Sequence, residues 1–133
     1  MTKLIKELKK EHKKILSTFL KLKGCSSTVD KHKEIFSIKK LLFDHLKKED
    51  DCLYVHLLAA AERDKKLKSI LDIFISHVKK ITEFAIKFYN DHEILTNEEG
   101  FLYDLDKLGI ELSVRIESEN NILFKEYEKR FTD

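Results

Sequence analysis

Residues 35–56 read IFSIKKLLFDHLKKEDDCLYVH and decide the architecture of the chain. Apolar residues recur there at steps of three and four, which is the period of one face of an α-helix. The same face continues through His45 and Glu49, so two polar side chains stand where apolar ones are expected. The stretch therefore predicts a helix that turns an interrupted apolar seam towards the interior of a helical bundle.

Three further segments have the same period, and polar loops separate them. The absence of proline and the presence of only three glycines favour long uninterrupted helices. We expect helices over 2–22, 29–62, 65–90 and 98–131. Because short connections make neighbouring helices antiparallel, the predicted fold is all-α, an up-down-up-down antiparallel four-helix bundle formed as a single domain by residues 1–133.

The seams predict which residues face the interior. The second seam continues through Cys52 and His56, and the third runs Leu67, Ile70, Phe74, His77, Ile81, Phe84, Phe88. The fourth runs Leu105, Leu108, Leu112, Arg115, Glu119, Ile122. The expected helix caps are one of Ser27, Thr28 and Asp30, then Asp64, and then Thr96 or Asn97.

Composition excludes several classes of protein. With 42% hydrophobic and 38% charged residues, the chain is neither disordered nor fibrous. It has no apolar run long enough to cross a membrane, and its first residues lack the apolar core of a signal peptide. We therefore expect a cytoplasmic protein without a membrane partner, in which Cys25 and Cys52 are reduced.

The net charge of +2 hides an uneven distribution. Residues 1–48 carry 14 lysines against 5 acidic residues, whereas residues 91–133 carry 5 basic and 12 acidic residues. The basic stretch has no arginine and almost no interleaved exposed aromatics, so we expect no nucleic-acid partner. Instead, a basic helix is predicted to lie beside an acidic one, with exposed ion pairs between them.

Polar residues interrupt each seam near the middle of its helix. The interruptions are His12, then His45 with Glu49, then His77, then Arg115 with Glu119. In an antiparallel bundle, two residues lie at the same height if the turn falls midway between them. The midpoints between these interruptions fall in the three turns, so all of them are predicted to lie at one level.

A metal centre gives a reason for gathering these groups, because burying them unpaired is costly. Neutral imidazole and carboxylate are good ligands for iron, zinc and manganese. His45 and Glu49 are one helical turn apart and so point at the same place. The interior of a helical bundle is also a recurring location for metal sites.

Three segments resemble the ligand helices of the hemerythrin-like family: Glu11–Ile15, Phe43–Asp50 with Leu53 and Tyr54 after it, and Ser76–Val78. The resemblance extends over almost the whole chain. It implies a four-helix bundle with a non-haem di-iron centre, which has histidine ligands on both irons and bridging carboxylates. By that resemblance His12, His45 and His77 would be terminal ligands, and Glu49 and Glu119 the bridges.

Arg115 departs from the family pattern, in which the fourth helix usually supplies another histidine one turn before its carboxylate. Arginine stays protonated and cannot coordinate a cation. Its guanidinium could pair with Glu119 or Glu49 and replace the charge of one iron. The site would then hold two metals with an open position, one metal, or none, with Arg115 closing a polar network.

These residues predict an iron protein that binds or senses dioxygen, nitric oxide, peroxide or iron itself. The alternative is a metal-free bundle of the same fold that acts as an interaction or regulatory module with a protein partner. An iron-dependent enzyme is a third interpretation. His32 and His92 lie near helix ends, and we expect them at the surface. His56 lies away from the predicted centre, and we expect it to be a structural or surface residue.

Overall fold

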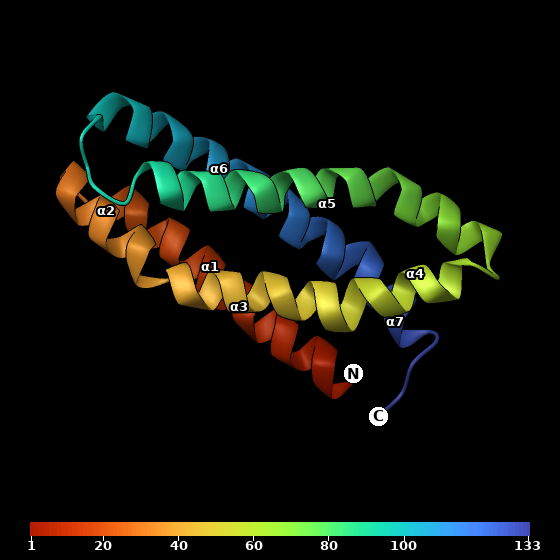
Figure 1. The fold of residues 1–133 in the computed structure, drawn as a ribbon. Helices are drawn as coiled ribbons and strands as arrows, with labels where there is room; N and C mark the ends of the chain where they lie inside the picture. Colours follow the sequence, from red (N-terminus) through yellow and green to blue (C-terminus); the bar gives the residue numbers. More distant parts are fainter.

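The computed structural model describes residues 1–133, and its helices run back and forth as four antiparallel arms (Figure 1). The all-α four-helix bundle is thereby confirmed. The first arm is α1 (Lys3–Gly24) and the third is α5 (Lys65–Asp91). The second arm comprises α2 (Thr28–Ser37), α3 (Lys39–Lys48), η1 (Glu49–Tyr54) and α4 (Val55–Ala61). The fourth comprises α6 (Glu98–Ser118), η2 (Glu119–Leu123) and α7 (Phe124–Glu128).

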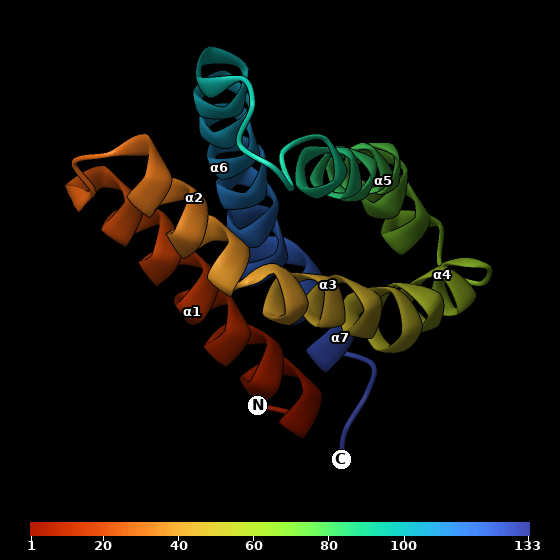
Figure 2. The same ribbon diagram turned by 60° about the vertical axis from the view of Figure 1, so that its left-hand side comes forward.

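Neighbouring arms pack along their lengths (Figure 2). Helix α1 lies along α2 and α3 and also contacts α6, and α5 contacts α4 and α6. Both termini lie at the same end of the bundle, where the backbone N–H of Lys3 donates to the carboxylate of Asp133 at 2.8 Å. Gly109 lies where α6 meets α1 and allows close packing there, because a Cβ at this position would stand only 3.1 Å from the ring of Phe19.

Side-chain caps start the arms, because the first N–H groups of a helix have no partner within it. Ser27 accepts from the N–H of Asp30, Asp64 from that of Leu67, and Asn97 from that of Gly100. These three caps agree with the sequence prediction.

Two of the predicted helices are interrupted. The predicted helix 29–62 breaks at Ile38, whose φ and ψ of −101° and 6° lie outside the helical range. Both 29–62 and 98–131 also contain a π-helical segment, in which each backbone hydrogen bond spans five residues instead of the four of an α-helix. The backbone N–H of Val55 bonds the carbonyl of Asp50 five residues earlier, and that of Phe124 bonds the carbonyl of Glu119.

The π-helical segments correct the predicted seams. Beyond Glu49 the inward face continues through Leu53, Leu57 and Ala61, at steps of four, with Tyr54 also buried, rather than through Cys52 and His56. Beyond Glu119 the fully buried residues are Leu123 and Phe124, while Ile122 is 39% exposed. A wide turn advances the inward face by about one residue relative to an α-helix, which accounts for both shifts.

A polar layer divides the core into two apolar halves. The half nearer the first and third loops contains Ile15, Leu22, Ile35, Leu42, Leu46, Ile81, Ala85, Phe88, Tyr89, Phe101, Leu105, Leu108, Leu112 and Ile116. The half nearer the termini contains Ile5, Leu8, Leu53, Tyr54, Leu57, Ala61, Leu67, Leu71, Val78, Leu123 and Phe124. His12, His45, Glu49, Arg115 and Glu119 are buried between them, at the level that the turn midpoints predict.

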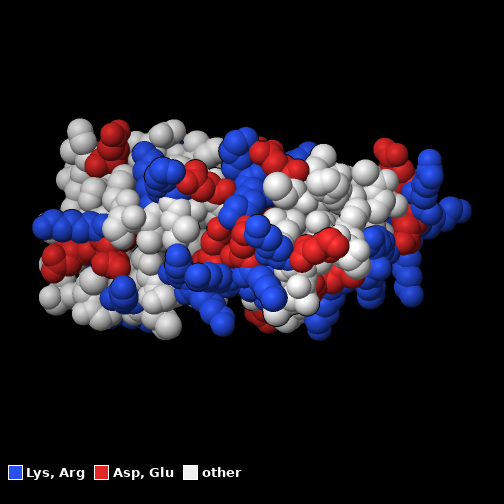
Figure 3. Space-filling view, turned by 90° about the horizontal axis from the view of Figure 1, so that it is seen from below, with Lys and Arg blue, Asp and Glu red and all other residues white.

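The surface charges differ from the prediction in one respect. Helix α1 does lie beside α6, yet no ion pair joins a lysine of residues 1–48 to an exposed acid of residues 91–133. Most exposed pairs instead join residues four apart on one helix, such as Lys40 with Asp44, because this spacing places them on the same side. Basic and acidic side chains lie interspersed on the face drawn in Figure 3. None of the helices combines the length and apolarity needed to cross a bilayer.

Candidate metal centre

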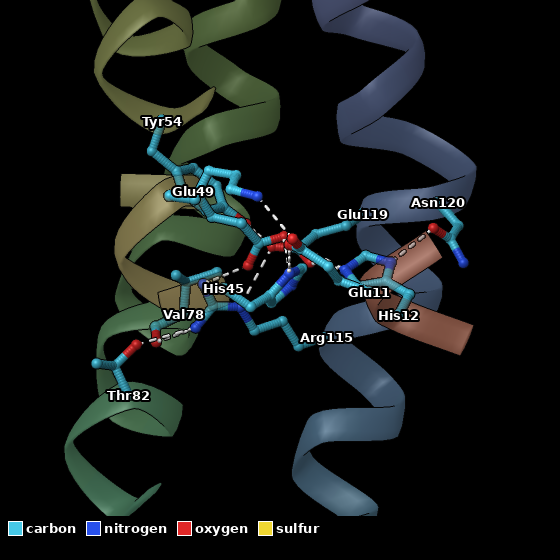
Figure 4. Close-up of polar contacts among 11 residues, drawn as sticks. Glu11, His12, His45, Glu49, Tyr54, Val78, Thr82, Arg115, Glu119 and Asn120 are labelled. Carbon is cyan, nitrogen blue, oxygen red and sulfur yellow. Dashed lines mark hydrogen bonds and ion pairs between the residues drawn. The ribbon is translucent and has the colours of Figure 1, made fainter. Parts of the chain in front are cut away.

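Four of the predicted ligands meet at the level of the polar layer, and each comes from a different part of the chain. His12 comes from α1, His45 from α3, and Glu49 and Glu119 from the first positions of η1 and η2. All four side chains are at most 2% exposed, and one donor atom of each lies within 4.8 Å of the others. Figure 4 shows their side chains converging from different arms of the bundle, with His45 and Glu49 on the same arm.

The two imidazoles are oriented from outside the cluster. The Nδ1 of His45 donates to Oε1 of Glu11 at 2.8 Å, and the Nδ1 of His12 donates to Oδ1 of Asn120 at 2.9 Å. A neutral imidazole carries only one N–H, so both Nε2 atoms then present lone pairs to the cluster. The ring of Phe124 stacks on that of His12, with centroids 5.2 Å apart, and holds its plane.

The Nε2 atoms face carboxylate oxygens. Oε2 of Glu49 lies 3.3 Å from the Nε2 of both His12 and His45. Oε1 of Glu119 lies 3.0 Å from the Nε2 of His12 but has no hydrogen-bond partner. Lone pairs on nitrogen and oxygen repel one another, so this arrangement calls for a cation between them, either a proton or a metal ion.

Arg115 holds the opposite side of the same two carboxylates. Its Nη2 donates to Oε1 of Glu49 at 3.0 Å and its Nε to Oε2 of Glu119 at 3.2 Å. Its Nη1 donates to two oxygens of α5, the hydroxyl of Thr82 at 2.9 Å and the carbonyl of Val78 at 3.3 Å. The buried hydroxyl of Tyr54 also donates to Oε2 of Glu119.

The two carboxylates have opposite pKa shifts. Burial acts to raise the pKa of Glu49, but the facing imidazoles of His12 and His45 and the charge of Arg115 outweigh burial and hold this pKa well below its usual value. Burial and the charge of Glu49 raise the pKa of Glu119 to about 7. Glu49 is therefore the permanent anion of the pair, and Glu119 is the carboxyl group whose charge depends on pH.

His12 serves as the proton acceptor of the metal-free cluster. Burial acts to lower the pKa of His12, but the nearby carboxylates of Glu119 and Glu49 raise it to about 9. Below that pH a proton on Nε2 is the cation between His12 and the two carboxylates. A metal ion that binds there replaces this proton.

His77 lies outside the cluster, contrary to the prediction. Its side chain is 45% exposed, and its Nε2 is 3.8 Å from a carboxylate oxygen of Glu111. The inward face of α5 runs through Leu71, Val78, Ile81, Ala85 and Phe88, so Val78 stands at the level of the polar layer. His77 precedes Val78 by one residue, which turns it about 100° away from that face.

The donor set fits a single transition-metal ion. Protein ligands lie about 2.0–2.2 Å from such an ion, which separates any two of them by about 3–4 Å. The four donor atoms are within 4.8 Å of one another, so a small inward adjustment brings them to that spacing. The unpartnered Oε1 of Glu119 would gain a partner. A second ion does not fit as well, because Arg115 faces the other two carboxylate oxygens.

Comparison with protein families identifies the domain. The family described as the hemerythrin HHE cation-binding domain matches residues 3–127. The chain belongs to the hemerythrin family. No curated protein and no solved structure matches it significantly. The family match and the buried histidine–glutamate cluster together indicate that this hemerythrin-like chain has a cation-binding site.

Three neighbours of the hemerythrin-like site were not predicted from the sequence to act there, although Glu11 and Tyr54 lie in the segments that resemble the ligand helices. Glu11 and Asn120 adjoin His12 and Glu119 in sequence, and each orients a histidine of the cluster. The usual chemistry of ligand histidines would have indicated Glu11 and Asn120, because the ring N–H that does not face the metal almost always donates to a nearby oxygen. Tyr54 carries no local signal, since only the wide turn of η1 places its hydroxyl on Glu119.

The remaining histidines lie away from the centre. His56 is exposed, as expected, and its Nδ1 lies 2.8 Å from the carbonyl of Cys52. His92 is buried rather than exposed, because its Nε2 bonds Asp104 at 2.7 Å. The Nε2 of His32 donates to the carbonyl of His92, so His32 is only partly exposed.

Proposed function

We propose that this chain is a non-haem iron protein that binds or senses a small molecule such as dioxygen, nitric oxide or peroxide. The ligands would be Nε2 of His12 and His45 together with one carboxylate oxygen each of Glu49 and Glu119. The observation that carries the proposal is the outward anchoring of both Nδ1 atoms, which leaves both Nε2 lone pairs facing carboxylates.

Iron is the metal that this donor set favours. Sites with histidine and carboxylate ligands and open coordination positions are typical of non-haem iron. When bound, iron would supply an open coordination position and redox activity to a small ligand. Zinc and manganese accept the same donors, so the identity of the metal is part of the test.

The surroundings support a small ligand rather than an organic substrate. The cluster is buried between two apolar halves of the core, which exclude bulk water. The hydroxyl of Tyr54 donates to Glu119 inside this space, and Arg115 supplies a fixed positive charge beside it. Both groups can stabilise negative charge that develops on a bound molecule. We also propose the cytoplasm as the location of the protein.

A metal-free interaction or regulatory module is the second candidate. The observation that favours it is Arg115, whose guanidinium bonds both carboxylates and two oxygens of α5. With a proton on His12, these contacts satisfy almost every buried polar atom of the layer without a metal. In that case the polar layer would have a structural role, and the function would reside in a surface that contacts a protein partner.

Metal analysis distinguishes the two candidates. Untagged protein purified without oxygen from iron-replete cells should contain stoichiometric iron, with near-ultraviolet charge-transfer bands that change on exposure to air. Glu49→Ala should lose the metal, whereas the matched controls His56→Ala and His77→Ala should retain it. Circular dichroism verifies that each variant is folded. Clearly substoichiometric metal in the wild-type protein would refute the iron proposal and favour the metal-free module.

A further inference from the structure

Each carboxylate of the cluster faces two ways. Oε2 of Glu49 points to the imidazoles of His12 and His45, while its Oε1 accepts from Nη2 of Arg115. Oε1 of Glu119 points to His12, while its Oε2 accepts from Nε of Arg115. The pair therefore bridges two positions, one beside the imidazoles and one at the guanidinium (Figure 4).

The guanidinium is held firmly at the second position. Arg115 is 2% exposed, and its Nη1 is tied to Thr82 and to the carbonyl of Val78 on α5. Although burial disfavours its charge, the charges of Glu49 and Glu119 raise the pKa of Arg115 above its ordinary value. The group is thus a permanent cation at every pH at which the protein is folded.

Helix α5 supplies no metal ligand to this second position. The residues that it presents there are Val78, through its carbonyl, and Thr82, through its hydroxyl. His77, the one histidine of α5, is turned to the surface. A metal ion at the second position would have to displace a buried arginine and would find only the carboxylates as strong ligands.

We propose that Arg115 is a built-in cation that takes the place of a second metal ion, so that the chain binds one ion and not two. This inference rests on the proposed metal site. Two carboxylates balance one divalent ion, and the guanidinium adds a further positive charge to the same pair. A second divalent ion beside the guanidinium would leave the carboxylates far outweighed by buried positive charge, which is strongly unfavourable.

The assignment gives the two oxygens of each carboxylate different roles. One oxygen is available to the metal, and the other is held by a donor that cannot leave. Glu49 and Glu119 are therefore fixed in orientation before any metal arrives. A preorganised ligand needs less reordering when it binds its ion, so Arg115 acts as a positioning residue for both carboxylates.

The test is the metal stoichiometry under anaerobic ferrous iron in excess, measured by elemental analysis after desalting. Wild type should bind one iron per chain, and the oxidised sample should give the electron paramagnetic resonance signal of an isolated ferric ion. Arg115→His removes the cation and adds a ligand, so its stoichiometry should rise towards two, with a spin-coupled pair. The matched control Arg63→His alters an exposed arginine and should still bind one.

Each outcome has a distinct meaning. Two irons in the wild type would overturn the role of Arg115 while leaving the proposed function intact. No iron in the wild type would overturn both. A stoichiometry that stays at one in folded Arg115→His would show that Arg115 is not what excludes the second ion. The wild-type measurement decides the matter even if the variant does not fold.

Discussion

Replacing Arg115 by methionine tests whether the guanidinium compensates the two buried carboxylates. Methionine fills a similar volume with an adaptable apolar chain, so packing changes little. Four hydrogen bonds are lost, and Glu49 and Glu119 remain together without a counter-charge. Removing one partner of a buried ion pair typically costs about 3–5 kcal/mol. A domain of this size loses about 3–4 °C in Tm per kcal/mol, so we expect a fall of about 10–20 °C.

The measurement is urea unfolding of the metal-free protein in chelator, followed by circular dichroism. The matched control Arg63→Met changes an exposed arginine and should stay within about 0.5 kcal/mol of the wild type. Adding Glu119→Gln to Arg115→Met should recover part of the loss, because it removes one of the two facing charges. If Arg115→Met is as stable as the control, the guanidinium does not compensate the carboxylates and the reasoning fails.

The destabilisation caused by Arg115→Met should also depend on pH. The pKa of Glu119 is raised above its ordinary 4.5 to about 7, so its protonated form favours folding at low pH. That contribution is lost as the pH rises through about 7. Without Arg115 the pKa should rise further, because the guanidinium lowers it. The destabilisation of Arg115→Met should therefore be smaller at pH 6 than at pH 8.

Three other predictions concern the ligands and the π-helical register. The pKa of His12 is raised from 6.5 to about 9, so the Tm of the metal-free protein should fall as the pH rises from 6.5 to 9. Metal affinity should rise over the same range, because the metal replaces the proton on His12. If Tm and metal affinity change with pH in the same direction, the proton and the metal do not share one position. Glu11→Gln weakens the hydrogen bond that orients His45 and should reduce metal affinity by about 10–100-fold in a calorimetric titration. An unchanged affinity would show that Glu11 has no role in metal binding. Leu123→Ala should cost about 2–5 kcal/mol in urea unfolding and Ile122→Ala much less, whereas a continuous α-helix would reverse the order.

The bundle and the level of its polar layer follow from spacing alone. Apolar residues at steps of three and four mark one face of each helix, and a local π-helical turn shifts that face without removing the helical period. The level depends only on where the turns fall, which caps such as Asp64 and Asn97 mark well. These features were predictable because they depend on many residues at once.

The register of the inward face was not predictable in the same way. A π-helical turn arises from the packing of the surrounding helices and has no clear local signature, so the burial of Leu53 and Leu123 could not be foreseen. On α5, steps of three and four fit the sequence equally well from Leu67 through His77 or through Val78. The contacts of Arg115 with Val78 and Thr82 are consistent with the second register.

The predicted ligands fall into two groups for a related reason. His45, Glu49 and Glu119 precede the wide turns or begin them, and His12 lies on the uninterrupted helix α1, so the α-helical period still holds at all four. Their burial could therefore be foreseen from the seams. His77 lies one residue from the inward face, and a single residue is enough to turn a side chain from the core to the solvent.

The polar layer also determines how the four arms align along their length. If the fourth arm slid past its neighbours by one turn, about 5.4 Å, Arg115 would keep Glu119 on its own arm but would lose Glu49 and its two oxygen partners on α5. Apolar seams alone tolerate such a slip, since leucine packs against leucine equally well one turn further on. A mismatched polar layer costs several kcal/mol and so rejects every alignment but one. The contacts among the same five side chains therefore favour the native alignment of the arms, whether or not a metal ion is bound.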